Sequence, residues 1–140
     1  MKLSSRSRYG FRAILQLAME YGKGRLQVKI IAKREDISSK YLEQLIATLK
    51  VNGLVYSIRG RGGGYLLSKH PSKIKLGEIF SALEGPEYSA DCTKHAKFTK
   101  GCGDCITRHI WSKIHRTRQD LLDSMTLQDL VDIAEGKKKL

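Results

Sequence analysis

The sequence predicts a mainly α-helical protein with a small β-hairpin wing, and three observations indicate this fold class. Apolar residues recur at helical spacing in several short segments that glycines separate. Residues 54–68 instead suggest two short strands around the glycine-rich turn RGRGGG. The helix expected just before them, over residues 38–52, carries a polar face. A helix of this kind followed by an arginine-bearing hairpin is typical of a winged helix-turn-helix, and a later apolar stripe adds a long dimerisation helix.

The first half of the chain is expected to hold three helices. Residues 7–21 form the first, and Gly22 and Gly24 end it, because glycine readily adopts the left-handed conformation of a helix terminus. A short second helix follows and stops at a polar turn. Ser38 or Ser39 can cap the third by accepting a bond from a free backbone N–H. The residues expected to face the core are Phe11, Ile14, Leu15, Ala18, Tyr21, Val28, Ile31, Ala32, Leu42, Leu45, Ile46 and Leu49.

The hairpin strands are expected at residues 54–59 and 65–68, with the tip at 60–64. A short helix over residues 76–83 follows a proline-containing connector and is stopped by a Gly-Pro pair. Residues 87–104 show no periodicity. We expect them to form a loop that something other than local sequence must organise.

A longer helix is expected over residues 105–122 and a final one over residues 126–135. Thr126 and Asp129 match a capping box, in which each side chain accepts a bond from the other residue's backbone N–H. The longer helix carries an apolar stripe with Trp111 beside it. Burying this stripe against a second copy would give a homodimer, which suits two-fold operators, whereas folding back onto the chain's own helices is the alternative. The stripe comprises Ile106, Ile110, Ile114, Thr117 and Leu121.

These elements suggest a division into a DNA-binding winged helix-turn-helix (1–75), a connector helix with a cysteine-containing cluster loop (76–104), and a dimerisation helix with the C-terminal helix and tail (105–140). Residues 1–75 contain 16 Lys/Arg and four Asp/Glu, whereas residues 76–140 contain 10 of each. A merely soluble basic surface would explain the charge but not its confinement to one half. Phosphate neutralisation explains both, so we expect double-stranded DNA as the partner.

The polar face of the helix over residues 38–52 offers groups that read base edges. Lys40 only donates hydrogen bonds, which suits guanine or phosphate, whereas Gln44 suits adenine. An acid is unfavourable beside phosphate, so Glu43 is expected to reject wrong bases, the alternative being that it pairs with a nearby lysine. The wing offers two arginines for the minor groove or the phosphates, and glycines that permit close approach. The expected DNA-binding residues are Ser38, Ser39, Lys40, Tyr41, Glu43, Gln44, Arg59, Arg61, Gly62 and Gly63.

Three cysteines, Cys92, Cys102 and Cys105, form the pattern C-x9-C-x2-C. Clustered thiols in a segment without periodicity are best explained by a metal or a cluster. A tetrahedral zinc or a [2Fe–2S] centre needs a fourth ligand, for which His95 and His109 are the local candidates. An iron–sulfur cluster is favoured, and zinc binding and thiol redox sensing stay open as alternatives that spacing alone does not separate from it.

Other classes of protein fit less well. The sequence lacks a run of about 18 apolar residues and a secretory signal, so no membrane segment is expected and the cytoplasm is the expected location. No nucleophile–base pair or paired carboxylates stand out, so we expect neither an enzyme nor a small-molecule substrate. An electron-transfer or scaffold protein is an alternative, against which the confinement of positive charge to the wing-bearing half argues.

Four segments resemble one family of bacterial winged-helix repressors and activators. They are MKLSSRSRYG, SSKYLEQLIATLKVNGLV, RGRGGGYLLSK and CITRHIW. The family is the Rrf-two family, which includes the IscR-like regulators of iron–sulfur cluster biogenesis. The resemblance implies a homodimer built through the long helix, and a three-cysteine loop that holds a [2Fe–2S] or, in nitric-oxide sensors, a [4Fe–4S] cluster. It also implies that Glu43 discriminates operators and that Arg59 enters the minor groove. We therefore expect a regulator of cluster biogenesis genes whose operator binding depends on the cluster.

Three features depart from the family pattern. The family spaces its cysteines about evenly, whereas the gaps here are nine and two residues. IscR-like members place a histidine three residues after the last cysteine, where this chain has Arg108, a donor-only cation that cannot ligate iron. The N-terminal aspartate of some nitric-oxide sensors is replaced by Arg8. His109 is therefore the first choice for the fourth ligand and His95 the second, and a residue of the partner subunit is a further alternative.

Overall fold

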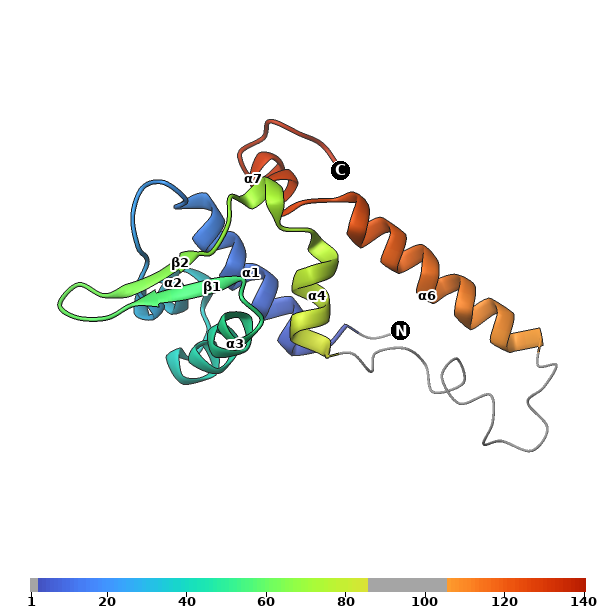
Figure 1. Cartoon of the computed structure of the whole chain (residues 1–140), viewed down its shortest axis with the longest axis horizontal. Coiled ribbons are helices and arrows are strands. Elements are labelled where there is room, and N and C mark those ends of the chain that lie inside the picture. Colours follow the sequence, from blue (N-terminus) through green and yellow to red (C-terminus); the bar gives the residue numbers. More distant parts are fainter. Residues whose placement is uncertain (1–2, 86–105) are drawn as a thin grey trace.

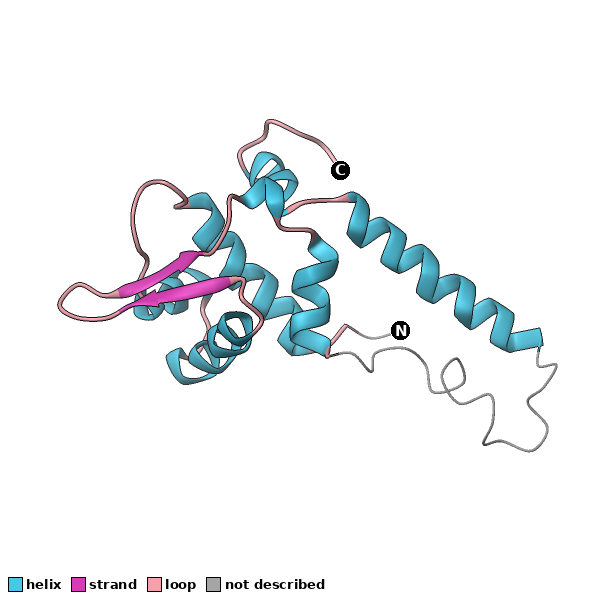
Figure 2. Ribbon diagram, in the orientation of Figure 1, coloured by secondary structure: helices cyan, strands magenta, loops and turns pink. Residues whose placement is uncertain are grey.

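The computed structural model describes residues 3–85 and 106–140 as a mostly helical protein with one antiparallel hairpin (Figure 2). This arrangement confirms the predicted fold class. The elements are α1 (Ser5–Met19), α2 (Val28–Glu35), α3 (Ser39–Val51), β1 (Val55–Ile58), β2 (Gly64–Leu67), the 3-10 helix η1 (Pro71–Lys73), α4 (Leu76–Glu84), α6 (Ile106–Ser124) and α7 (Leu127–Ala134).

The hairpin projects from one end of the molecule as a wing (Figure 1). Its register pairs Val55 with Leu67 and Ile58 with Gly64. The strands carry β-branched and aromatic residues, which favour a pleated surface, and glycines occupy the connection between them. The predicted strands are confirmed: β1 is one residue shorter at each end than the predicted 54–59, and β2 begins and ends one residue earlier than the predicted 65–68.

The core lies between α1, α3 and α4 and includes the whole predicted stripe of α3. Phe11 is half-buried and packs against this core as predicted, whereas the prediction for Tyr21 is wrong, because its side chain is 40% exposed. The helix ends at Met19, so Tyr21 leaves the helical register, and its ring instead contacts that of His70 at 5.1 Å between centroids. The buried residues of α1 are Ser7, Gly10, Ala13, Ile14, Leu17 and Ala18.

Glu84, the last residue of α4, ties the end of that helix to the start of α1. Its carboxylate accepts hydrogen bonds from the hydroxyls of Ser4 and Ser7 at the start of α1. Ser4 also caps α1 by accepting from the backbone N–H of Ser7 at 3.1 Å. Close by, a β-carbon on Gly10 would lie 2.5 Å from both Leu83 δ-carbons, so α1 and α4 approach at a distance that suits glycine.

The C-terminal part of α6 lies beside α4, and its N-terminal part extends away from the rest of the molecule (Figure 1). None of its residues is buried. The Arg118 guanidinium lies over the Phe80 ring at 5.2 Å, and a β-carbon on Gly77 would overlap the Asp123 carboxylate, so the C-terminal part of α6 packs closely on α4. The predicted helix is confirmed, and its apolar stripe faces away from its own chain: Ile106, Ile110, Ile114 and Leu121 are 78%, 54%, 40% and 61% exposed.

A clasp of two backbone bonds fixes where α6 ends. The N–H of Leu76 donates to the carbonyl of Met125 at 3.0 Å, and the N–H of Leu127 donates to that of Ile74 at 2.9 Å, on either side of a bridge between Lys75 and Thr126. The chain entering α4 and the chain leaving α6 are therefore held together.

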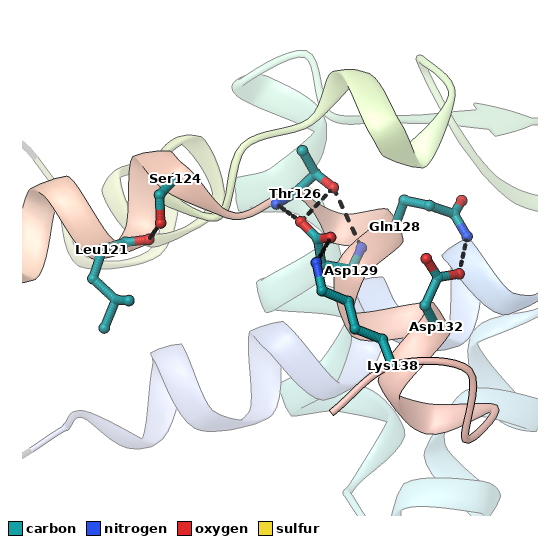
Figure 3. A network of polar contacts seen from close by, with 7 residues as sticks. All are labelled: Leu121, Ser124, Thr126, Gln128, Asp129, Asp132 and Lys138. Carbon is teal, nitrogen blue, oxygen red and sulfur yellow. Dashed lines mark hydrogen bonds and ion pairs between the residues drawn. The ribbon is translucent and has the colours of Figure 1, made fainter. Parts of the chain in front are cut away.

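The predicted capping box at the start of α7 is confirmed (Figure 3). The Asp129 carboxylate accepts from the Thr126 backbone N–H at 2.7 Å, and the Thr126 hydroxyl accepts from the Asp129 N–H at 3.3 Å. The Lys138 ammonium donates to the same carboxylate at 2.5 Å. The hydrogen bond from Lys138, followed by those from Thr126, lowers the pKa of Asp129 to about 2.

Asp129→Ala is expected to lower the free energy of unfolding by about 1 kcal/mol near neutral pH, because α7 loses its cap. The folded-state pKa lies below the ordinary value of 3.8, so the contribution is fully present above that value and is lost as the pH falls toward about 2. Melting temperatures measured along this pH range should therefore converge for the two proteins. Asp120→Ala, which removes an exposed acid from α6, is the control; a gap that stays constant with pH would contradict the assignment.

Candidate nucleic-acid interface

The helix α3 presents a polar face to solvent. The side chains of Lys40, Glu43 and Gln44 are all exposed, as their positions outside the apolar stripe predict. The Ser38 hydroxyl accepts from the backbone N–H of Tyr41 at 3.2 Å, which confirms Ser38 as the cap of α3. The start of α3 is thus held in place while three chemically different side chains remain available for a partner.

Glu43 differs from two other acids of the basic half. Glu35 accepts from Arg12 Nε at 2.6 Å and from Gln16 Nε2 at 2.5 Å, and Glu20 accepts from Arg34 at 3.1 Å, so these two acids are paired within the α1–α2 contact. Among residues 3–85 and 106–140, no hydrogen bond or ion pair involves the side chain of Glu43. The lysine pairing weighed as an alternative is therefore not formed there, and the carboxylate is available to accept from a base.

Tyr41 and its neighbours line the side of α3 that faces α1. Its ring meets that of Tyr9 edge-on at 6.0 Å, and its hydroxyl lies 3.4 Å from that of Ser5. A recess of about 290 Å³ opens here, lined by Arg6, Tyr41, Gln44, Leu45 and Thr48. Tyr41 thus packs α3 against α1. Direct contact of Ser38, Ser39 or Tyr41 with DNA stays a prediction.

The wing tip carries Arg59 and Arg61, both exposed. Close approach to DNA was the predicted reason for glycine at the tip, and contacts within the chain give a second reason. A β-carbon at Gly63 would lie 2.5 Å from the Ile58 carbonyl oxygen, and one at Gly64 would lie 2.8 Å from that of Leu26. Backbone atoms cannot yield to such contacts, so these two positions suit glycine whatever the wing binds. The contacts predicted for Gly62 and Gly63 with phosphate stay predictions.

Two residues contact the wing that the sequence did not predict to do so. Lys50 Nζ donates to the Ser57 hydroxyl at 2.7 Å and so ties the end of α3 to β1. Arg25 lies over the tip, because Leu26 forms an antiparallel bridge with Tyr65. A bridge of a single residue has no periodicity, so no pattern in the sequence could signal it.

Most of the predicted sensor residues fall outside the described ranges: Cys92, His95, Cys102 and Cys105. His109 lies in the first turn of α6, is exposed, and in the described part of the chain makes no hydrogen bond or ion pair. Neither residues 3–85 nor residues 106–140 contain a group of three potential metal ligands. An unengaged imidazole four residues after Cys105 fits a set of thiolate ligands that needs one more donor.

Comparison with known proteins identifies the family. A model of the Rrf2 family, described as an iron-dependent transcriptional regulator, matches residues 3–133. The chain belongs to the Rrf2 family. This confirms the resemblance seen in the sequence. As members of the Rrf2 family are transcriptional regulators, the chain is a regulator and not an enzyme.

Rrf2 relatives of two kinds match over nearly the whole chain. CymR of Bacillus subtilis is 37% identical over 139 residues, covering 99% of this chain and 96% of that protein. Its structure, described as that of the global cysteine regulator, matches with a TM-score of 0.82 at 36% identity and covers 95% of this chain and 98% of that one. IscR of Klebsiella pneumoniae is 40% identical over 138 residues, covering 96% and 82% of the two chains. The structure of T. potens IscR has a TM-score of 0.82 at 38% identity and covers 100% and 93%.

Within the portion that the structure describes, no helix is both long and apolar enough to span a bilayer.

Proposed function

We propose that this Rrf2 protein is a homodimeric regulator whose operator binding is modulated by an iron–sulfur cluster, and that it controls cluster biogenesis genes. Cys92, Cys102 and Cys105 would hold the cluster, with His109 as the fourth ligand. The observation that carries the proposal is the exposed imidazole of His109, four residues after Cys105, at the start of the helix that bears the apolar stripe.

Each ligand would contribute a distinct property. Thiolates bind iron strongly, whereas a neutral imidazole raises the reduction potential of a [2Fe–2S] centre and loses its metal on protonation. A bound cluster would supply a charge that changes with its oxidation state, close to the start of α6. Because α6 packs on α4 and its stripe is available for a second copy, a change at its first turn can alter the pairing of two subunits and hence the separation of their α3 helices.

A thiol-based regulator with the same DNA-binding half is the second candidate. It is favoured by the similarity to CymR, whose structure is described as that of a global cysteine regulator. In that case the C-x-x-C pair and the third cysteine would exchange between thiol and disulfide forms without a metal. Zinc bound by the same ligands is a further form of this candidate.

A visible absorption spectrum of anaerobically purified protein, with analysis of iron, sulfide and zinc, separates these candidates. The proposal requires charge-transfer bands with matching amounts of iron and sulfide. A colourless protein with stoichiometric zinc, or one with neither metal, would overturn the cluster assignment. Titration of a duplex pool with loaded and cluster-free protein then measures whether the cluster alters DNA binding.

Glu43→Ala is expected to relax sequence preference by about tenfold while it lowers overall affinity little, because an acid discriminates among bases and repels phosphate. The measurement is enrichment from a pool of randomised duplexes, compared between variant and parent. Glu20→Ala, which removes an acid paired with Arg34, is the matched control. A uniform loss of affinity across all sequences would refute the discriminating role.

A further inference from the structure

A third arginine lies on the wing beside the two that the hairpin carries. Arg25 is exposed and belongs to the segment between α1 and α2, far from Arg59 in the sequence. Two backbone bonds fix this segment against the hairpin: the N–H of Leu26 donates to the Tyr65 carbonyl at 3.1 Å, and the N–H of Tyr65 donates to the Leu26 carbonyl at 2.9 Å. The position of Arg25 is therefore set by the sheet.

The guanidinium of Arg25 lies against the tip of the wing at Gly62. A β-carbon there would be 3.1 Å from Arg25 Nη2, 3.9 Å from Cζ and 4.0 Å from Nε. Gly62 has a φ of 71°, in the left-handed region that favours glycine. Both the turn and the close approach of the guanidinium suit a residue without a side chain, so the tip accommodates Arg25 closely.

The three arginines share surroundings that lack negative charge. Neither residues 22–34 nor residues 54–68 contain an aspartate or a glutamate. Over the described ranges, no acidic side chain forms an ion pair with Arg25, Arg59 or Arg61. Three permanently charged guanidinium groups from two segments thus gather at one end of the molecule, each with donors that match an oxyanion.

We propose that Arg25 binds a backbone phosphate of duplex DNA beside the groove that the wing meets, so that the wing grips DNA with arginines from two separate segments. The inference rests on the DNA binding of the proposed function and adds a contact outside the hairpin. Duplex DNA is the partner that fits, because it carries about one negative charge per 1.7 Å of its axis and can engage several neighbouring guanidinium groups at once. A contact with phosphate carries no base information, so Arg25 supplies affinity and register.

The test is a titration of wild type, Arg25→Ala and Arg59→Ala with a fluorescein-labelled duplex of mixed sequence over a series of salt concentrations. Arg25→Ala is expected to bind about threefold to tenfold more weakly and to flatten the slope of log affinity against log salt by about one unit. Arg25→Lys should recover part of the affinity and all of the slope, because it keeps the charge. Lys73→Ala removes the same charge from η1, away from the tip, and should leave the slope unchanged.

The outcomes separate this inference from the function on which it rests. If Arg25→Ala binds with the affinity and slope of the wild type while Arg59→Ala is weaker, the contact is absent and the proposed DNA binding stands. If Lys73→Ala flattens the slope as much as Arg25→Ala, the effect is one of net charge and the inference is overturned. If the wild type itself shows no salt-dependent binding, the proposed function fails first.

Discussion

Replacing Ile110 and Ile114 by aspartate is expected to give a monomer that binds a two-half-site duplex about 100-fold more weakly than the wild type. Both side chains are exposed in the single chain, at 54% and 40%, and lie on the stripe of α6 that faces away from α4. Burying them against a second copy removes apolar surface from water, whereas unpaired aspartates in the same interface would have to be desolvated. Light scattering measures the mass and so checks the loss of the dimer. Titration of a duplex selected by the wild type checks the loss of affinity.

The control for this variant is Arg116→Asp. It changes the net charge by as much as the double substitution does, on the same helix, but from the polar flank of α6. It should remain a dimer. If the double variant is dimeric with unchanged affinity, the stripe is not the interface.

Replacing Cys102 by alanine is expected to abolish the visible absorption of the anaerobically purified protein and to leave a folded dimer. One of three thiolates is lost, and a cluster of this type needs four ligands. The packing of α6 on α4 involves Arg118, Phe80 and Gly77 and does not depend on a thiol, so circular dichroism and light scattering should be unchanged. A variant that unfolds would show instead that the metal is structural, as zinc would be.

His109→Ala extends the same test to the fourth ligand. The absorption bands of the cluster should shift, or fade faster on exposure to air, because alanine supplies no donor and a more weakly bound ligand such as water would take the place of the imidazole. His115→Ala is the control on the same helix, since that imidazole lies 2.8 Å from Arg118 Nη2 and within α6 rather than at its start. Bands that are identical in His109→Ala and the wild type would exclude His109 and leave His95 or a residue of the partner subunit.

Local patterns predicted the parts of this fold that depend on neighbouring residues. The Ser38 cap, the Thr126–Asp129 capping box and the stripe of α3 each follow from spacing within one or two turns. The hairpin was predictable because its glycines cluster between two short runs of β-forming residues.

Features that join distant segments were not predictable in this way. The bridge at Leu26 brings Arg25 to the wing, and Glu84 at the end of α4 accepts hydrogen bonds from two serines at the start of α1, without any periodic signal. The assignment of Tyr21 to the core failed because α1 ends at Met19, so Tyr21 lies beyond the helix and off its apolar stripe. Helix ends are harder to place from sequence than the helices themselves. For the cysteines, spacing gives a ligand count, and the choice between metal and thiol chemistry depends on geometry that spacing does not contain.

The clasp at Lys75 and Thr126 gives the chain between these residues the topology of a closed loop. Both ends are tied to each other and to α7, and α4 and α6 run antiparallel from that point. The entropic cost of closing a flexible loop rises only with the logarithm of its length, about 0.6 kcal/mol for each doubling. Changes in the number of residues between Lys75 and Thr126 are therefore expected to cost little in the stability of the fold that holds α3 and the wing.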